Sequence, residues 1–227
     1  MTHIDVQHVT YALPDGRVLL DDVSFRVGDG AVAAMVGANG SGKSTLMKFV
    51  SGEWQPHEGS IVCSGSVAVM PQFIGHMTKG DVRDLLLTVA PERIRKAAAE
   101  LDAVELLMME QDDEPTQMRY AQAISDWGDV GGYDIEVVWD KCTMAAMGKP
   151  FDEVRWRDVG TLSGGEQKRL VLEALMLGPD AILLLDEPDN YLDVPGKRWL
   201  EEQLKATEKT VLLISHDREL LAAAATH

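Results

Sequence analysis

A glycine-rich segment in the first quarter of the chain has residue types that bind phosphate. Residues 37–44 read Gly-Ala-Asn-Gly-Ser-Gly-Lys-Ser, which fits the pattern G-x-x-x-x-G-K-[ST] of a phosphate-binding loop. The glycines allow backbone N–H groups to close around a β-phosphate, and a helix that begins near Lys43 adds its positive end. Lys43 can reach β- and γ-phosphate oxygens, while the Ser44 hydroxyl can bind Mg²⁺. The segment therefore predicts a site for a nucleoside triphosphate with magnesium.

A second pair of chemically active residues follows an apolar run much later in the chain. Residues 182–185 are four aliphatic side chains, and Asp186 and Glu187 come directly after them. At the carboxyl end of a buried strand, Asp186 can hold Mg²⁺ through water. Glu187 can orient and deprotonate an attacking water molecule. Together with the phosphate-binding loop, this pair predicts hydrolysis of the bound triphosphate.

Residues 162–167, Leu-Ser-Gly-Gly-Glu-Gln, form a third motif. A serine and two glycines at the start of a helix expose N–H groups to an anion. On these three motifs the chain resembles the ATP-binding cassette (ABC) superfamily, in which this segment is the signature. The resemblance implies that the signature faces the γ-phosphate held by a second cassette, in the same full-length chain or in a homodimer. The signature residues are Ser163, Gly164, Gly165 and Glu166.

The resemblance implies roles for further residues. His216 matches the switch histidine that contacts the γ-phosphate, and Gln72 matches the residue that senses Mg²⁺ and the γ-phosphate. Asp193 closes the loop that crosses the interface between two cassettes. Tyr11 matches the aromatic residue that stacks on adenine, although a lone tyrosine in a strand packs in the core more often than it stacks on a ligand. The implied catalytic residues are Glu187, His216 and Lys43. The residues implied to hold Mg²⁺ are Ser44, Gln72 and Asp186. The residues implied to contact ATP are Tyr11, Gly37, Ala38, Asn39, Gly40, Ser41, Gly42, Lys43, Ser44, Thr45, Gln72 and Asp186.

The elements that position these motifs are expected to alternate between strands and helices. Apolar or alternating runs predict strands, and periodic segments predict helices. This order favours a parallel sheet covered on both faces. With the resemblance, we expect an α/β P-loop NTPase fold of ABC type: a mostly parallel core sheet, an N-terminal antiparallel β subdomain and an inserted α-helical subdomain. The expected strands are 4–8, 18–25, 31–36, 67–70, 181–185 and 210–214, and the expected core helices are 44–51, 164–177, 195–204 and 218–225.

The composition changes between residues 79 and 158, where strand patterns stop and Ala, Leu, Met, Glu and Arg dominate. We therefore expect one ABC ATPase domain over 1–227, with a core of 1–78 and 159–227 and a helical insertion at 79–158. Within the insertion, helices are expected at 93–111, 117–127 and 135–147. Its methionines are expected to fill space between these helices.

Two features resemble the ABC-F proteins, which have no membrane domain and act on ribosomes. Residues 185–193 read Leu-Asp-Glu-Pro-Asp-Asn-Tyr-Leu-Asp, similar to the LDEPxNxLD run of that family. The hairpin at 91–127 lies where ABC-F proteins carry an arm directed toward tRNA. It holds 4 basic against 9 acidic residues, a balance of −5, and an acidic surface binds phosphate poorly. A structural helical subdomain therefore remains an equal interpretation of the hairpin.

Three classes of function are consistent with these motifs. The first is a soluble ABC-F-type ATPase in translation or antibiotic resistance, with the ribosome or tRNA as a partner. The alternative is the ATP-binding subunit of an ABC transporter. A non-catalytic scaffold is disfavoured by the intact Lys43, Glu187 and His216. Because ABC-F proteins hold two cassettes and this chain ends shortly after His216, we expect it to be an N-terminal half or a truncated form.

The composition limits the kinds of partner and the cellular compartment that we expect. The net charge of −16 excludes a basic field over the whole chain of the kind that nucleic-acid binders carry. No run of 18 apolar residues and no signal peptide is visible, so no direct membrane insertion is expected. Cys63 and Cys142 lie far apart and predict reduced thiols rather than a disulfide or metal site. These features predict a cytoplasmic protein.

Overall fold

The computed structural model describes residues 1–71, 79–111 and 113–224. The chain divides into two compact units. The α/β unit comprises Met1–His76 and Pro179–His227, and the helical unit comprises Met77–Gly178. Gln72, expected to bind Mg²⁺ and nucleotide, lies outside the described residues.

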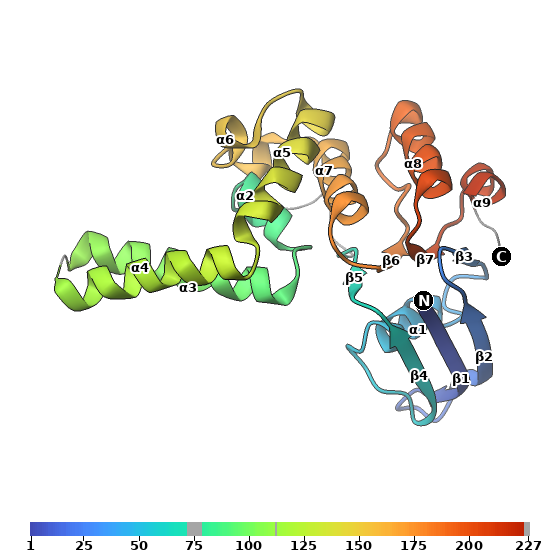
Figure 1. Ribbon diagram of the computed structural model, residues 1–227. Helices are drawn as coiled ribbons and strands as arrows, with labels where there is room; N and C mark the ends of the chain where they lie inside the picture. Colours follow the sequence, from blue (N-terminus) through green and yellow to red (C-terminus); the bar gives the residue numbers. More distant parts are fainter. Residues whose placement is uncertain (72–78, 112, 225–227) are drawn as a thin grey trace. The chain divides into compact units, whose positions relative to one another are not determined.

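The α/β unit contains two sheets (Figure 1). The strands β1 (His3–Ala12), β2 (Val18–Val27) and β4 (Glu58–Ser64) form an antiparallel sheet in the order β2-β1-β4. The strands β3 (Val32–Met35), β5 (Val67–Val69), β6 (Ile182–Asp186) and β7 (Thr210–Ile214) form a parallel sheet in the order β3-β7-β6-β5. The predicted parallel core and N-terminal antiparallel sheet are confirmed.

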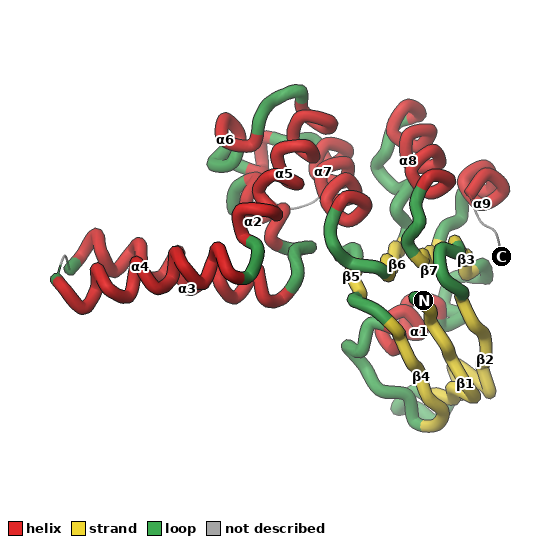
Figure 2. Tube along the Cα trace, in the orientation of Figure 1, coloured by secondary structure: helices red, strands yellow, loops and turns green. Residues whose placement is uncertain are grey.

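In the part of the α/β unit that the structure describes, three helices accompany the sheets: α1 (Lys43–Val50), α8 (Val194–Ala206) and α9 (Arg218–Ala224). The buried side of α1 joins one apolar cluster with both sheets, including Ile4 of β1, Phe49 of α1 and Leu184 of β6. Helices α8 and α9 lie on the other face of the parallel sheet (Figures 1 and 2). The aliphatic residues of β6 and β7 are buried throughout, because both faces of the sheet are covered. This packing fixes the strand ends that carry the functional residues.

The helical unit contains α2 (Val82–Leu87), α3 (Glu92–Glu110), α4 (Glu114–Asp129), α5 (Gly132–Met147), α6 (Phe151–Val154), a short 3-10 turn (Val159–Thr161) and α7 (Gly164–Leu177). Helices α3 and α4 form the expected hairpin (Figure 1). We expected the insertion to end at 158, but the unit runs through Gly178 because α7 packs on α5 and α2. No helix of the described ranges is long and apolar enough to cross a membrane.

The structure contradicts the expectation for three methionines and agrees with the expectation for the two cysteines. The methionines were expected to fill the space between helices, but Met109, Met118 and Met144 are exposed, so that expectation is wrong for these three. Both cysteines are free thiols. Burial raises the pKa of the Cys142 thiol to about 12, which keeps it protonated near neutral pH.

Candidate active site

The phosphate-binding loop connects β3 to α1 in the α/β unit. Gly42 caps α1 in the left-handed conformation, with φ 93°, which favours glycine. A Cβ atom at this position would lie 2.8 Å from Cδ2 of Leu20, so a larger residue would also displace the end of this leucine side chain. The Leu46 N–H donates to the Gly42 carbonyl over 2.8 Å and closes the first helical turn. The loop thus directs the N-terminus of α1, with its partial positive charge, into the site.

Lys43 lies back across the loop that contains it. Its ammonium group donates to the carbonyl oxygens of Gly37 and Ala38 over 2.9 and 3.0 Å. These bonds hold a positive charge beside the backbone N–H groups of the loop. An anion that binds there would meet both the ammonium group and the helix terminus, which is the chemistry of a phosphate site.

Glu187 occupies a left-handed backbone conformation directly after β6, with φ 49°. Its N–H donates to the Ile214 carbonyl of β7 over 2.9 Å, which joins the ends of the two strands. Its Oε1 lies 3.9 Å from Nε2 of His216, and the Asn190 amide donates to its Oε2. The structure therefore brings the predicted base and the predicted switch histidine together, with Asn190 as a further partner of the carboxylate.

Asp189 and Ser215 link the loop after β6 to the loop after β7. Both residues are buried. The Ser215 hydroxyl donates to Oδ1 of Asp189 over 2.7 Å and accepts from the Asp217 N–H over 2.9 Å. Asp217 also pairs with Lys197 over 2.7 Å. This bond lowers the pKa of the Asp217 carboxyl and raises the pKa of the Lys197 ammonium. The network connects the segments that carry Glu187 and His216.

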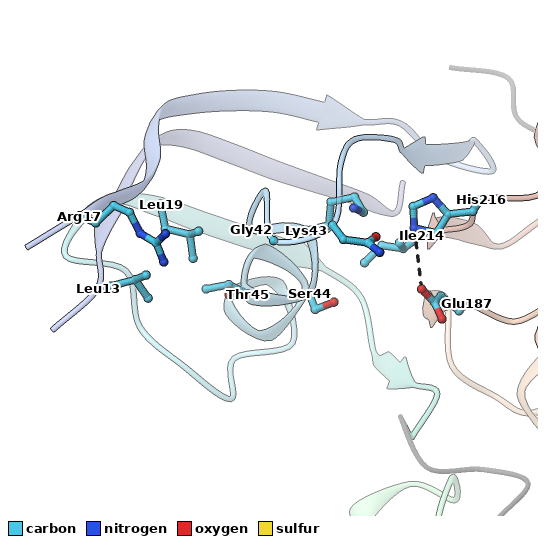
Figure 3. Close-up of a pocket in the computed structure, with 12 residues that line it drawn as sticks. Leu13, Arg17, Leu19, Gly42, Lys43, Ser44, Thr45, Glu187, Ile214 and His216 are labelled. Atoms are coloured by element: carbon cyan, nitrogen blue, oxygen red, sulfur yellow. Dashed lines mark ion pairs between the residues drawn. The ribbon is translucent and has the colours of Figure 1, made fainter. Parts of the chain in front are cut away.

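A pocket of about 440 Å³ extends along the phosphate-binding loop and the segments that follow β6 and β7 (Figure 3). This volume is typical of small-molecule sites. Its lining includes the predicted catalytic residues Lys43, Glu187 and His216. It also includes residues that sequence reasoning did not assign, namely Leu13, Arg17, Leu19 and Ile214. The predicted loop residues that line it are Asn39, Gly40, Gly42, Lys43, Ser44 and Thr45.

Two of the predicted magnesium ligands, Ser44 and Asp186, line a neighbouring cavity of about 300 Å³. A hydroxyl and a carboxylate are oxygen ligands that suit Mg²⁺. The described residues contain no group of three or more His, Cys, Asp or Glu that could hold a metal ion. The Ser44 hydroxyl and the Asp186 carboxylate fit an ion that also takes ligands from water and from nucleotide phosphates.

The predicted signature begins α7 in the helical unit. The Glu166 N–H donates to Oγ of Ser163 over 3.2 Å, and the Ser163 N–H donates to Oε2 of Glu166 over 2.8 Å. This reciprocal capping orients the first turn, which contains Gly164 and Gly165. The bonds from Ser163 lower the pKa of the Glu166 carboxyl. In the α/β unit, Asp193 caps α8 by accepting from the Gly196 N–H over 2.8 Å.

Tyr11 lies in an aromatic cluster rather than in the lining of the pocket. Its ring centroid is 5.0 Å from Phe49, 4.6 Å from His57 and 6.5 Å from Trp54. It is not among the twelve residues that line the 440 Å³ pocket. The stacking of Tyr11 on adenine stays a prediction.

Comparisons with known proteins identify the family of this chain. The family model described as "ABC transporter" matches residues 20–190. An "Antibiotic resistance protein" of Mycobacteroides abscessus is 56% identical over 226 residues, which cover 99% of this chain and 41% of that protein. The "Energy-dependent translational throttle protein EttA" of Haemophilus influenzae is 33% identical over 226 residues, which cover 99% of this chain and 34% of that protein. The chain thus spans less than half the length of these relatives.

A solved structure shows the same fold. The "Structure of ATP binding subunit of ABC transporter" has a TM-score of 0.69 and 18% sequence identity, and the match covers 98% of this chain and 82% of that chain. The predicted fold class is therefore confirmed. The matched family segment contains the phosphate-binding loop, the signature and Glu187.

Proposed function

Because the chain belongs to the ABC transporter family, we propose that it binds MgATP and hydrolyses it when paired with a second cassette. The observation that supports this most strongly is the 440 Å³ pocket, whose lining joins Lys43 to Glu187 and His216. A phosphate-binding loop alone indicates only binding. A carboxylate and a histidine at the far end of the same pocket add the groups that hydrolysis requires.

In this proposal each side chain acts on a different part of the triphosphate. Lys43 and the loop N–H groups bind the β- and γ-phosphate oxygens. Glu187 accepts a proton from the attacking water, and His216 donates a hydrogen bond to the γ-phosphate. Ser44 and Asp186 would hold Mg²⁺, which neutralises charge on the phosphate oxygens when bound. Asn190 orients the carboxylate of Glu187 through its hydrogen bond.

The signature is the reason for proposing a pair of cassettes. Ser163 and the first turn of α7 present an anion-binding helix terminus in the helical unit. In the proposed pair, this terminus contacts the γ-phosphate held by the loop of the other cassette, and Asp193 lies near the interface. Each chain would therefore contribute two unlike halves to two sites.

We further propose that the chain works as an ABC-F-type ATPase in translation or antibiotic resistance, in contact with the ribosome or tRNA in the cytoplasm. The names of the Mycobacteroides and Haemophilus relatives support this proposal, as does the run at 185–193. The similarity to a transporter subunit, at 18% identity, concerns the fold alone. The transporter role therefore has weaker support.

Titration of the chain with MgATP tests the binding step. Lys43→Ala removes the ammonium group that lies over the loop, so we expect ATP affinity to fall at least about tenfold. Lys205→Ala in α8 is the matched control, because Lys205 is exposed and lines neither the 440 Å³ pocket nor the 300 Å³ cavity. Equal ATP affinity for the wild type and Lys43→Ala would show that this loop does not bind the nucleotide.

A further inference from the structure

Helix α5 carries apolar side chains on two opposite faces. One face is buried in the helical unit and includes Ile135 and Trp139. On the opposite face, Tyr133, Val137 and Met144 have exposed fractions of 55, 58 and 48%. A helix on the surface of a globular unit normally presents polar residues to solvent. Contiguous apolar residues in that place indicate a surface that binds a partner.

The three exposed side chains form a line along the helix. They follow one another at spacings of four and seven residues. Because an α-helix turns by about 100° per residue, their directions agree within about 40°. Each residue advances the helix by about 1.5 Å, so the line is about 16 Å long. We call Tyr133, Val137 and Met144 the exposed face of α5.

Trp156 lies beside this face and has an exposed fraction of 64%. Helix α6, which precedes Arg155, packs beside α5 (Figure 1). The guanidinium carbon of Arg155 lies 4.8 Å from the centroid of the Trp156 ring. Nη2 of the same arginine lies 4.0 Å from Oε1 of Glu136 in α5. Arg155 therefore joins Trp156 to the exposed face of α5.

Two arginines hold the Trp156 ring. Besides Arg155, the guanidinium carbon of Arg83 lies 5.9 Å from the ring centroid. Arg83 is buried, and its Nη1 donates to Oδ2 of Asp102 over 2.8 Å. Cation–π contacts with two guanidinium groups restrict the motion of the ring. An exposed tryptophan that is already held in place loses little side-chain entropy when a partner covers it.

The residue types of this surface favour a protein partner. Tryptophan, tyrosine, methionine and arginine are enriched where proteins bind one another. The helical unit contains 12 basic against 20 acidic residues, and this charge repels the phosphates of RNA and the headgroups of anionic lipids. A straight line of apolar residues on a helix matches the apolar face of a second helix.

The charged residues of α5 indicate the charge of that second helix. Asp134, Glu136 and Asp140 are acidic, and Lys141 is the one basic residue of the helix. Arg155 lies opposite Glu136, whereas Asp134 is exposed. A partner with lysine or arginine beside its apolar residues is attracted to this surface, and an acidic partner is repelled.

We propose that the exposed face of α5, together with Trp156, binds a basic amphipathic helix of a partner protein. This inference goes beyond nucleotide hydrolysis and does not depend on it. The apolar residues of the partner pack along the exposed face of α5, and the Trp156 ring covers the side of the partner helix. Its basic residues pair with the carboxylates of Asp134 and Asp140.

Isothermal titration of the folded chain with a synthetic peptide tests the proposal. The probe is a peptide of about 18 residues, built from leucine and lysine so that the leucines line one face of a helix. We expect it to bind with a Kd of about 10–100 µM. A peptide of the same composition in scrambled order should bind at least about tenfold more weakly, as should a peptide with glutamate in place of every lysine.

Substitutions on the chain locate the binding surface. Val137→Ser and Trp156→Ala should each weaken binding of the leucine–lysine peptide by about three- to tenfold, since each removes apolar contact area. Val137→Ile keeps an apolar residue and should bind like the wild type. Val62→Ser is the matched control, because Val62 in β4 has a similar exposed fraction of 54% and belongs to the α/β unit. Circular dichroism checks that every variant is folded.

The proposal is overturned if Val137→Ser and Trp156→Ala bind the peptide as tightly as the wild type, or if Val62→Ser weakens binding as much as they do. Equal affinity for the scrambled peptide overturns it as well. So does a different occupant of the same surface. That occupant would be a single-stranded RNA oligonucleotide or anionic vesicles whose binding these two variants abolish, or a second copy of the chain in a dimer that Val137→Ser dissociates in light scattering.

Discussion

Glu187 is the residue on which the proposed chemistry depends. Glu187→Gln keeps the size of the side chain and its bond from Asn190, but it removes the group that accepts a proton. In an assembled pair of cassettes we expect turnover to fall by about 10²–10⁴-fold while MgATP binding is retained. Single-turnover hydrolysis measures this effect. Hydrolysis at the wild-type rate would mean that another group activates the water.

The sequence was sufficient to predict residues whose type and spacing are tied to phosphate chemistry. Lys43, Glu187 and His216 line one pocket, as the motifs indicate. Sequence could not identify Leu13 or Arg17 as pocket residues, because a leucine and an arginine in a turn have many uses. The contact partners of Tyr11 depend on where Phe49 and His57 lie in space, and no local pattern contains that information.

At the level of elements, the buried bond between Ser215 and Asp189 is expected to hold the loops after β6 and β7 together. Ser215→Ala leaves the buried Asp189 carboxylate without the hydroxyl that donates to it, so the free energy of unfolding should fall by about 1–3 kcal/mol. Asp189→Asn, which keeps an acceptor of the same size, is the matched control and should cost less. Urea denaturation measures both values. Equal losses for the two variants would contradict this account.

The junction of α4 and α5 gives a second prediction at this level. A Cβ atom on Gly132 would lie 2.1 Å from the Trp127 ring, so Gly132→Ala should overpack the junction and destabilise the protein by about 1–3 kcal/mol. Gly128→Ala is the control, because its Cβ would meet Tyr133 at 3.4 Å and alanine favours the helix. The midpoints of thermal unfolding compare the stabilities of the two variants. An unchanged midpoint for Gly132→Ala would show that the junction adjusts freely.

Sequence patterns predicted the long helices and the buried strands, but they missed strand β4, the short helices α2 and α6 and the 3-10 turn at Val159–Thr161. Strand β4 contains glycine and serine, which have low strand propensity, and it forms by pairing with β1. Helix α2 is only six residues long, and a capping box between Asp81 and Asp84 stabilises its start. Helix α5 begins at Gly132 rather than at 135, because the small glycine allows close contact with Trp127.

At the scale of the whole molecule, the proposed hydrolysis needs two different surfaces, each supplied by a different cassette. The phosphate-binding loop, Glu187 and His216 belong to the α/β unit, whereas the signature belongs to the helical unit. Hydrolysis in the proposed pair uses the signature of one cassette against the nucleotide of the other. Each hydrogen-bond donor placed where charge develops contributes about 2.7–4 kcal/mol to lowering the barrier. A cassette without a partner should therefore bind ATP and hydrolyse it very slowly.

The need for a second cassette can be tested by measuring the specific ATPase rate of the chain over a hundredfold dilution series. We expect the rate per chain to rise with protein concentration, because a second copy must supply the signature. Light scattering of Glu187→Gln should show a larger dimer fraction with MgATP than without it, since this variant binds ATP but does not consume it. A constant rate per chain from a species that stays monomeric at every concentration would contradict the account.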